Sequence, residues 1–262
     1  MSISGIILAA VVVGGTGLVI SILLGIASEK FKVPVDEKEV AVRECLPGNN
    51  CGGCGFAGCD ALAKAIAAGE APVGACPVGG QPVADKIASI MGVEAGAGEK
   101  QVAFVKCAGT CDKAKSKYKY AGNEDCVSAM SVPGGGPKAC SFGCTGFGSC
   151  VKVCDFDAIH VINGVAVVDK EKCVACGKCV ATPKSLIELV PYAAPHKVQC
   201  NSKEFGKAVK EVCSAGCIGC KMCTRVCEAD AITVENNIAK IDYSKCTGCG
   251  KCAEKCPAKI IL

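Results

Sequence analysis

The spacing of its cysteines constrains the fold of this chain more than any other feature of the sequence. Of 262 residues, 25 are cysteine. Three runs place a cysteine at every third position: Cys173, Cys176 and Cys179; Cys217, Cys220 and Cys223; Cys246, Cys249 and Cys252. Cysteines this dense converge on one point, which suits a metal cluster better than separate disulfides. An odd number cannot pair completely within one chain, and thiolate clusters need a reducing compartment. We therefore expect metal clusters and a cytoplasmic location for this part of the chain.

The remaining composition indicates that such clusters staple the fold. Aromatic residues make up 4% of the chain, there is no tryptophan, and glycine occurs 32 times. So few large side chains do not fill an ordinary core, and cysteine is the residue that can supply cross-links in their place. A hydrophobic share of 50% argues against disorder. With His160 and His196 as the two histidines, a hydrolase built on a histidine-centred site is poorly supported.

The N-terminal segment predicts a transmembrane helix over residues 1–28. No charged side chain occurs in this range, and Ile3 to Ala27 is almost wholly apolar. About 25 helical residues reach about 37 Å, enough to cross a hydrocarbon core of about 30 Å. A cleaved signal peptide is the alternative, but the positively charged start that such peptides carry is missing.

Two further features of this segment bear on its surroundings. Basic residues follow it, and by the positive-inside rule they predict that the C-terminal side is cytoplasmic; they are Lys30, Lys32, Lys38 and Arg43. Gly17, Ser21 and Gly25 are spaced four apart and form a stripe of small residues. Such a stripe suits close packing on another transmembrane helix, and a plain anchor is the other interpretation.

The first cysteine group predicts a small helical [4Fe–4S] domain over residues 29–97. Its candidate ligands are spaced x2, x4 and x16: Cys51, Cys54, Cys59 and Cys76. The glycines between them let the backbone approach a bulky ligand. Zinc also accepts four thiolates, but this spacing is unlike the paired knuckles of zinc ribbons. A phosphate-binding loop is disfavoured because no Gly-Lys-Ser/Thr follows. Residues 60–69 read as a short helix.

An internal repeat of 73 residues predicts two tandem modules. Shifting the chain by 73 brings seven cysteines into coincidence: Cys140, Cys144, Cys150, Cys154, Cys173, Cys176 and Cys179 fall on Cys213, Cys217, Cys223, Cys227, Cys246, Cys249 and Cys252. The sequence between these cysteines also matches, and each copy has an apolar strand, an Asn-centred turn and a second strand. We assign the modules to residues 136–204 and 205–262, and residues 98–135 to a cysteine-containing connecting segment.

The second copy has the complete cysteine pattern of a bacterial two-cluster ferredoxin. In that pattern the fourth cysteine of each run ligates the other cluster. One [4Fe–4S] cluster is therefore expected on Cys217, Cys220, Cys223 and Cys256. The other is expected on Cys227, Cys246, Cys249 and Cys252. Glu228 replaces the usual proline after Cys227, a departure that we expect to be tolerated.

The first copy is incomplete. Cys154, Cys173, Cys176 and Cys179 make one full ligand set. For the partner cluster, Phe147 stands where the second copy has Cys220, and Pro183 stands where it has Cys256. Cys144 and Cys150 remain, and Cys140 can replace one lost ligand. The fourth ligand is missing. An outside cysteine then completes the site, the cluster has three irons, the cluster is absent, or the sequence contains an error of one lost residue.

The sequence thus predicts four [4Fe–4S] clusters, a fifth with an unknown fourth ligand, and room for a sixth. Six cysteines have no recognised motif, and passive thiols are the other interpretation for them: Cys45, Cys107, Cys111, Cys126, Cys200 and Cys213. The expected class is α+β and stapled by iron–sulfur clusters: one N-terminal transmembrane helix, a small helical 4Fe–4S domain and two ferredoxin-like modules.

The formal charge does not indicate a nucleic-acid partner. It is +4 with cysteines counted as neutral thiols. Each four-thiolate [4Fe–4S] site carries roughly −2, so five such sites would bring the protein to about −6. Four lysines surround the last cysteine run and are either a docking patch for an acidic electron carrier or ordinary solvated lysines: Lys245, Lys251, Lys255 and Lys259.

Taken together, these motifs resemble the B subunit of the Rnf complex, the ion-translocating ferredoxin:NAD oxidoreductase. The resemblance rests on NCGGCGFAGC with CPVGG, on GCTGFGSCVKVC (143–154) and on GCIGCKMCTRVCEADAI (216–232), together with the N-terminal helix. Related chains have a cysteine where CVATPKS has none.

This resemblance implies an electron-transfer subunit that crosses the cytoplasmic membrane once and has its cysteine-rich part on the cytoplasmic side. Reduced ferredoxin would be the electron donor, and membrane and peripheral subunits of the complex would receive the electrons on the way to NAD. We expect no catalytic residues in this chain, so it would be an enzyme only as part of the complex. The second module would take up electrons and the N-terminal cluster would release them. The alternative is an iron–sulfur subunit of another membrane-associated redox enzyme; a zinc-binding or metal-buffering protein is a third interpretation.

Overall fold

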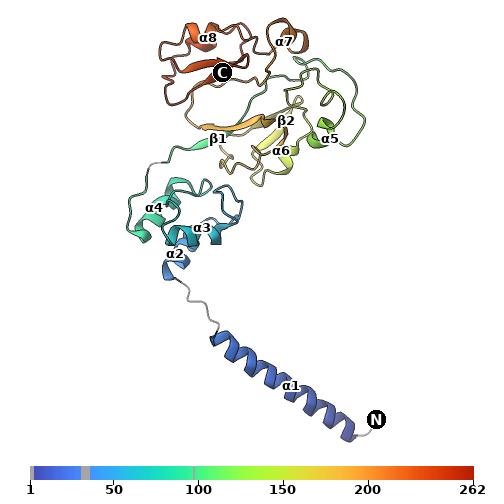
Figure 1. The fold of residues 1–262 in the computed structure, drawn as a ribbon, viewed down its shortest axis with the longest axis vertical. Coiled ribbons are helices and arrows are strands. Elements are labelled where there is room, and N and C mark those ends of the chain that lie inside the picture. The colour runs from blue at the N-terminus through green and yellow to red at the C-terminus, as the bar shows by residue number, and fades with distance from the viewer. Residues whose placement is uncertain (1–2, 31–35, 97) are drawn as a thin grey trace.

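The computed structural model describes residues 3–30, 36–96 and 98–262. Figure 1 shows a long N-terminal helix at one end, a helical unit in the middle, and a larger unit of short strands and loops at the other end. Lys32, which entered the prediction of sidedness, lies outside the described residues.

Helix α1 (Ile3–Lys30) is the apolar helix expected at the N-terminus. It carries no acidic residue in its first turn and has Lys30 in its last. The stretch from Val12 to Lys30 is long and apolar enough to cross a membrane, and none of it is buried against the rest of the chain. Its exposed apolar side chains, Leu18, Leu23 and Leu24 among them, suit a lipid environment.

Three helices form the middle unit: α2 (Glu37–Cys45), α3 (Cys59–Ala67) and α4 (Gly80–Met91). Asp36 caps α2, since its carboxylate accepts a hydrogen bond from the Lys38 backbone N–H at 2.9 Å. The small core between the helices is made by side chains that are at most 1% exposed: Val42, Leu62, Ala63, Ile66 and Ile87. Arg43 Nε donates to Asp60 Oδ1 at 2.5 Å and joins α2 to α3.

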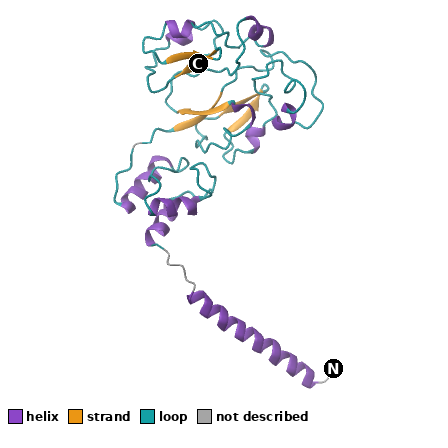
Figure 2. Ribbon diagram, in the orientation of Figure 1, coloured by secondary structure: helices purple, strands orange, loops and turns teal. Residues whose placement is uncertain are grey.

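The larger unit contains three separate two-stranded antiparallel sheets (Figure 2). Two are hairpins: β2 (Ile159–Ile162) with β3 (Val165–Val168), and β5 (Ile232–Glu235) with β6 (Ile238–Ile241). Their turns, Asn163-Gly164 and Asn236-Asn237, have positive φ at both residues, as tight hairpins with right-handed twist require. The third sheet pairs β1 (Gln101–Val105) with β4 (Ile187–Pro191) and so joins the connecting segment to the end of the first module.

The 73-residue repeat extends to the local structure. Adding 73 to the bounds of α6 (Ser149–Lys152), β2 and β3 gives the bounds of α8 (Met222–Arg225), β5 and β6. The remaining elements of the larger unit are α5 (Cys126–Met130), the 3-10 turn η1 (Pro183–Ser185), α7 (Lys207–Val212) and α9 (Lys251–Glu254).

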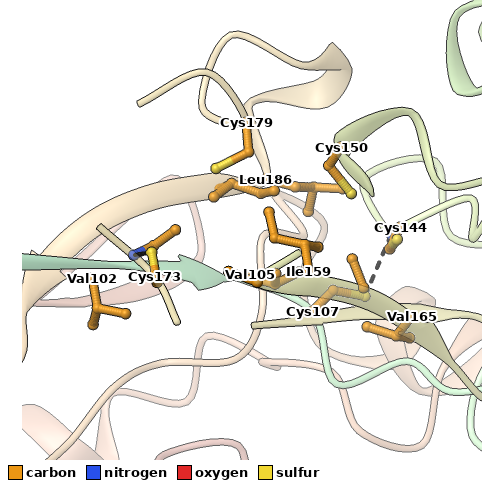
Figure 3. Close-up of a cluster of buried hydrophobic side chains, with 14 of the residues drawn as sticks. Val102, Val105, Cys107, Cys144, Cys150, Ile159, Val165, Cys173, Cys179 and Leu186 are labelled. Carbon is orange, nitrogen blue, oxygen red and sulfur yellow. Dashed lines mark hydrogen bonds between the residues drawn. The ribbon is translucent and has the colours of Figure 1, made fainter. Parts of the chain in front are cut away.

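Cysteines form part of the interior of this unit. In one buried cluster, Cys107, Cys144, Cys150, Cys173 and Cys179 lie among the aliphatic side chains (Figure 3). In another, Cys200, Cys223 and Cys252 pack with Ile232 and Ile260. A core that contains so many sulfur atoms leaves the cysteines positioned to hold groups inside the fold.

Candidate iron–sulfur centres

The second module brings its cysteines together in the two groups expected from the ferredoxin pattern. One cavity is lined by Cys217, Cys220, Cys223 and Cys256, with Val234 and Ile260 beside them. A second is lined by Cys227, Cys246, Cys249 and Cys252. Burial, with a smaller contribution from the neighbouring Cys217, raises the pKa of Cys223 to about 11. Such a thiol becomes a thiolate at neutral pH when a metal takes the place of its proton.

The complete set of the first module also surrounds one cavity. Cys154, Cys173, Cys176 and Cys179 line it together with Ala103 of β1. The Ala103 backbone N–H donates to Cys173 Sγ, and the Ala158 N–H donates to Cys154 Sγ, each at 3.4 Å. Hydrogen bonds of this kind to cluster sulfurs tune the potential of iron–sulfur centres. Strand β1 is therefore part of this site, although it lies outside the residues assigned to the module.

The N-terminal group lies between the loops around α3 and α4. Cys59, the first residue of α3, and Cys76 are buried, whereas Cys51 and Cys54 are partly exposed. Cys76 Sγ accepts a hydrogen bond from the Gly79 N–H at 3.4 Å. Burial raises the pKa of Cys76, and Cys59 and Cys54 contribute to the rise.

The N-terminal group also lies against the first module. A Cβ on Gly53 would be 2.5 Å from the carbonyl oxygen of Cys176. Cys51 is close enough to Cys176 to raise its pKa, after the larger effect of burial. Two candidate cluster sites therefore face each other across the boundary between the helical unit and the larger unit.

The donor sets fit iron–sulfur clusters better than single metal ions. Within residues 3–30, 36–96 and 98–262, no three His, Cys, Asp or Glu side chains are arranged to hold one metal ion. A tetrahedral zinc site draws its thiolates to about 2.3 Å from a common centre. A [4Fe–4S] cluster binds one thiolate at each of its four irons and so spreads the sulfurs around a larger object. Cysteines that ring a cavity match the second arrangement.

Comparisons with known proteins agree with this chemistry. Residues 46–78 match a family described as "Putative Fe-S cluster", and residues 216–260 match a family described as "4Fe-4S dicluster domain". The B subunit of the Na(+)-translocating ferredoxin:NAD(+) oxidoreductase complex of Acetobacterium woodii is 48% identical over 252 residues, which cover 95% of this chain and 75% of the relative.

Two further relatives match over nearly their whole length. The B subunit of the ion-translocating oxidoreductase complex of Methanosarcina acetivorans is 42% identical over 95% of both chains. The chain belongs to the Rnf complex B-subunit family. The B subunit of the proton-translocating ferredoxin:NAD(+) oxidoreductase complex of Clostridium ljungdahlii is also 42% identical, over 98% of this chain and 92% of the relative.

Near its end, the first module is one residue shorter than the second. The Lys106 N–H donates to Leu186 O, and the Gln199 N–H donates to Ile260 O, each at 2.8 Å. Leu186 and Ile260 are 74 positions apart, whereas the modules are otherwise offset by 73. The extra offset arises within CVATPKS, where the second copy carries Cys256. Relative to the second module, the first therefore lacks the one position that Cys256 occupies.

Near this gap the structure brings a new cysteine, Cys126, to Cys144 and Cys150. Burial raises the pKa of Cys150 to about 11, with further contributions from Cys144 and Cys126. Helix α5 holds Cys126 there through Ser149, whose Oγ accepts from the Cys126 N–H at 2.9 Å and donates to Asp125 Oδ1 at 2.7 Å. Burial raises the pKa of Cys126, but hydrogen bonds from Ser149 and other neighbours outweigh it and lower the pKa overall.

Phe147, which replaces a ligand, is one of these neighbours, and its backbone contributes to the lowered pKa of Cys126. Cys126 therefore lies near the position of the first lost ligand. Motif spacing gave no sign of it, because it lies 18 residues before Cys144 in a segment without a counterpart in the second module.

The cysteine-rich interior near the gap also contains a lysine. Lys184 Nζ donates to the carbonyl oxygens of Gly143 at 3.0 Å and Gly135 at 3.2 Å. Burial lowers the pKa of Lys184, and the nearby cysteines Cys140 and Cys144 oppose that shift. Cys140 itself, expected beside Cys144 and Cys150 as a replacement ligand, lines a different cavity.

Proposed function

We propose that this chain is a membrane-anchored, multi-cluster iron–sulfur subunit that relays electrons from reduced ferredoxin toward the membrane subunits of an Rnf-type ion-pumping complex. The observation that carries the proposal is the set of cysteine-lined cavities in the larger unit, one in the first module and two in the second, the last of which includes the exposed Cys249. Clusters in these cavities would supply one-electron transfer without bond making, and the chain would set their spacing and environment.

The proposed architecture is a membrane helix, an N-terminal cluster domain (29–97) and two tandem two-cluster ferredoxin modules (136–204 and 205–262). The matching bounds of α6–β3 and α8–β6 support the duplication. The dicluster match over residues 216–260 supports the ligand pattern of the second copy. On this basis four [4Fe–4S] clusters would be held by the four complete cysteine sets.

Electrons would be taken up at the cluster held by Cys227, Cys246, Cys249 and Cys252. Cys249 is exposed, and this module lies at the end of the molecule opposite α1 (Figure 1). Four lysines surround this cysteine run in the sequence, together with the exposed Glu254. Lys245 and Lys251 pair with Asp242 and Glu228. Lys255 and Lys259 are exposed and take part in none of the ion pairs of the described residues. Unpaired lysines beside an exposed cluster suit the docking of an acidic ferredoxin.

Electrons would leave through the N-terminal cluster. Its domain follows α1 in the chain, and the Gly53–Cys176 contact supplies a connection to the first module. With α1 in the cytoplasmic membrane, Lys30 at its C-terminal end and the oxygen-sensitive sites beyond it both favour a cytoplasmic position for the remainder of the chain.

Charge reversal tests the docking surface. The double variant Lys255→Glu/Lys259→Glu should slow reduction of the full-length protein by reduced ferredoxin about tenfold or more at low ionic strength, because steering depends on complementary charge. Added salt should narrow the difference. The matched control is Lys207→Glu/Lys210→Glu, which makes the same change in net charge on α7, where both lysines are exposed.

Equal rates for the two double variants would refute the docking surface. Failure of reduced ferredoxin to reduce the wild-type protein would refute the donor itself and would favour service to another membrane-associated redox enzyme.

A further inference from the structure

Four cysteines outside the complete ligand sets line a single cavity between the two modules. They are Cys107, Cys140, Cys200 and Cys213. Cys107 follows β1, Cys140 begins the cysteine run of the first module, and Cys213 ends α7. Cys107, Cys200 and Cys213 are buried, with at most 9% of each residue exposed. Four segments of the chain thus converge on one cavity.

The sulfur atoms lie close to the same glycines. A Cβ on Gly109 would be 3.5 Å from Cys107 Sγ and 3.5 Å from Cys213 Sγ. A Cβ on Gly143 would be 3.5 Å from Cys140 Sγ and 3.7 Å from Cys107 Sγ. Glycine at both positions lets the backbone pass close to the sulfurs and to any group that they hold.

The two modules contribute to this cavity in equivalent ways. Cys107 Sγ accepts hydrogen bonds from the N–H groups of Gly109 and Cys144, each at 3.4 Å. Cys200 Sγ accepts from Ser202 at 3.5 Å and from Cys217 at 3.3 Å. Cys144 and Cys217 are related by the repeat, and so are Cys140 and Cys213. The site therefore consists of two equivalent pairs, each with one cysteine at the start of a module's cysteine run and one that precedes that run.

The groups around this cavity are also suited to stabilise negatively charged sulfur atoms. Each of the sulfurs of Cys107 and Cys200 receives two backbone N–H groups, the arrangement that stabilises cluster thiolates. Lys138 Nζ, held by the carbonyl oxygens of Gly109 at 2.8 Å and Gly164 at 2.6 Å, lies near Cys213 and Cys144. Passive buried thiols need neither paired N–H donors nor a nearby ammonium group, because they are neutral.

We propose that Cys107, Cys140, Cys200 and Cys213 hold a further [4Fe–4S] cluster at the interface between the modules. Its position gives it a role in the relay, and that role rests on the function proposed above. The Cys144 N–H touches Cys107 on one side, and the Cys217 N–H touches Cys200 on the other. The interface cluster therefore connects the Cys144 group of the first module with the Cys217–Cys256 cluster of the second, and it passes single electrons with no bond made or broken.

Metal content tests the site without reference to ferredoxin. In full-length protein purified anaerobically in detergent, the symmetry-related double variant Cys107→Ala/Cys200→Ala should lose about four iron and four sulfide per chain relative to wild type. The single variant Cys213→Ala should show, after oxidation, the electron paramagnetic resonance signal of a three-iron cluster. Cys45→Ala is the matched control, because Cys45 lies in the helical unit, outside these cavities, and should leave iron and sulfide unchanged.

Wild-type iron and sulfide in the double variant would overturn the proposal, and so would loss of zinc in place of iron. If the double variant loses all of its iron through misfolding, the Cys213→Ala signal decides: a three-iron signal supports the interface cluster, and its absence with full iron content refutes it. The relay role has its own readout. Ferredoxin-driven reduction of the N-terminal cluster should slow at least tenfold in Cys213→Ala, and a wild-type rate would refute the connection while leaving the metal site intact.

Discussion

Gly53 controls how closely the N-terminal cluster domain approaches the first module, and Gly53→Ala tests that contact. The added Cβ would lie 2.5 Å from Cys176 O and 2.9 Å from Cys176 Cα. Both are backbone atoms of a loop that also carries cluster ligands, so no side-chain rotation relieves the overlap. Gly53 does not have a positive φ, so alanine suits its own backbone and the effect arises at the boundary.

The size of the effect follows from the overlap. Contacts between carbon atoms are comfortable at about 3.5–4.0 Å, so the two surfaces have to separate by about 1 Å. Overpacking of this kind costs about 1–3 kcal/mol. A penalty of that size lowers the docked population about 5- to 150-fold relative to the undocked one.

Two measurements on full-length protein check this prediction. Hydrogen exchange should become faster at residues 51–55 and 174–178. Freeze-quench electron paramagnetic resonance should show slower reduction of the N-terminal cluster, with the clusters of the second module reduced at the wild-type rate. The control is Gly52→Ala, which strains the same loop through its φ of 73° but meets nothing closer than Phe56 O at 3.7 Å. The reasoning is refuted if Gly53→Ala matches wild type in both measurements, or if Gly52→Ala has the same effect.

Two other predictions concern stability. Ile66→Ala should lower the free energy of unfolding of the helical unit by about 2–5 kcal/mol, since Ile66 is 1% exposed in its core. The control, Val40→Ala at an exposed position of α2, should change the same free energy by less than about 0.5 kcal/mol. Equal shifts of the two variants in thermal denaturation would contradict the assigned core. Anaerobic removal of iron by a chelator should abolish the β-hairpin contribution to the circular dichroism spectrum while α1 stays helical, because sulfurs form much of the interior of the larger unit. Retention of the hairpins after complete iron loss would show that the clusters do not stabilise the fold.

Sequence patterns were most informative where ligands are close together in the chain. The x2-x2-x3 runs of the second module place three cysteines of each group within a turn or two of one another, and the ferredoxin pattern takes the fourth from the other run. The structure has the same groups. The hairpins followed from alternating apolar residues and Asn-centred turns for the same reason. The N-terminal apolar helix was also evident from its length and composition alone.

The repeat in the sequence did not predict the group of interface cysteines, because an insertion changes the spacing in the first copy. Cys107 precedes Cys140 by 33 positions, whereas Cys200 precedes Cys213 by 13. A single offset therefore aligns Cys140 with Cys213 but misses Cys107 and Cys200. The short match Val105-Lys106-Cys107 with Val198-Gln199-Cys200 was the available signal. The same insertion contains α5, so the segment that obscured the repeat is also the one that brings Cys126 to the site with a lost ligand.

The β1–β4 sheet could not be predicted from the sequence for a different reason. Its strands are five residues each and more than 80 positions apart. Their pairing depends on where the module between them folds, which no local pattern encodes.

That long-range pairing has a consequence for biosynthesis. The helical unit is closed by contacts among residues 36–91, so it can take up its cluster while the ribosome is still making the rest of the chain. The Cys154–Cys179 site must wait, because Ala103 donates to Cys173 from a strand that β4 holds in place. The interface cavity waits longer still, until Cys213 has been synthesised. Clusters would thus be inserted in order from the membrane outward, and a stalled or truncated chain would carry only those nearest the bilayer.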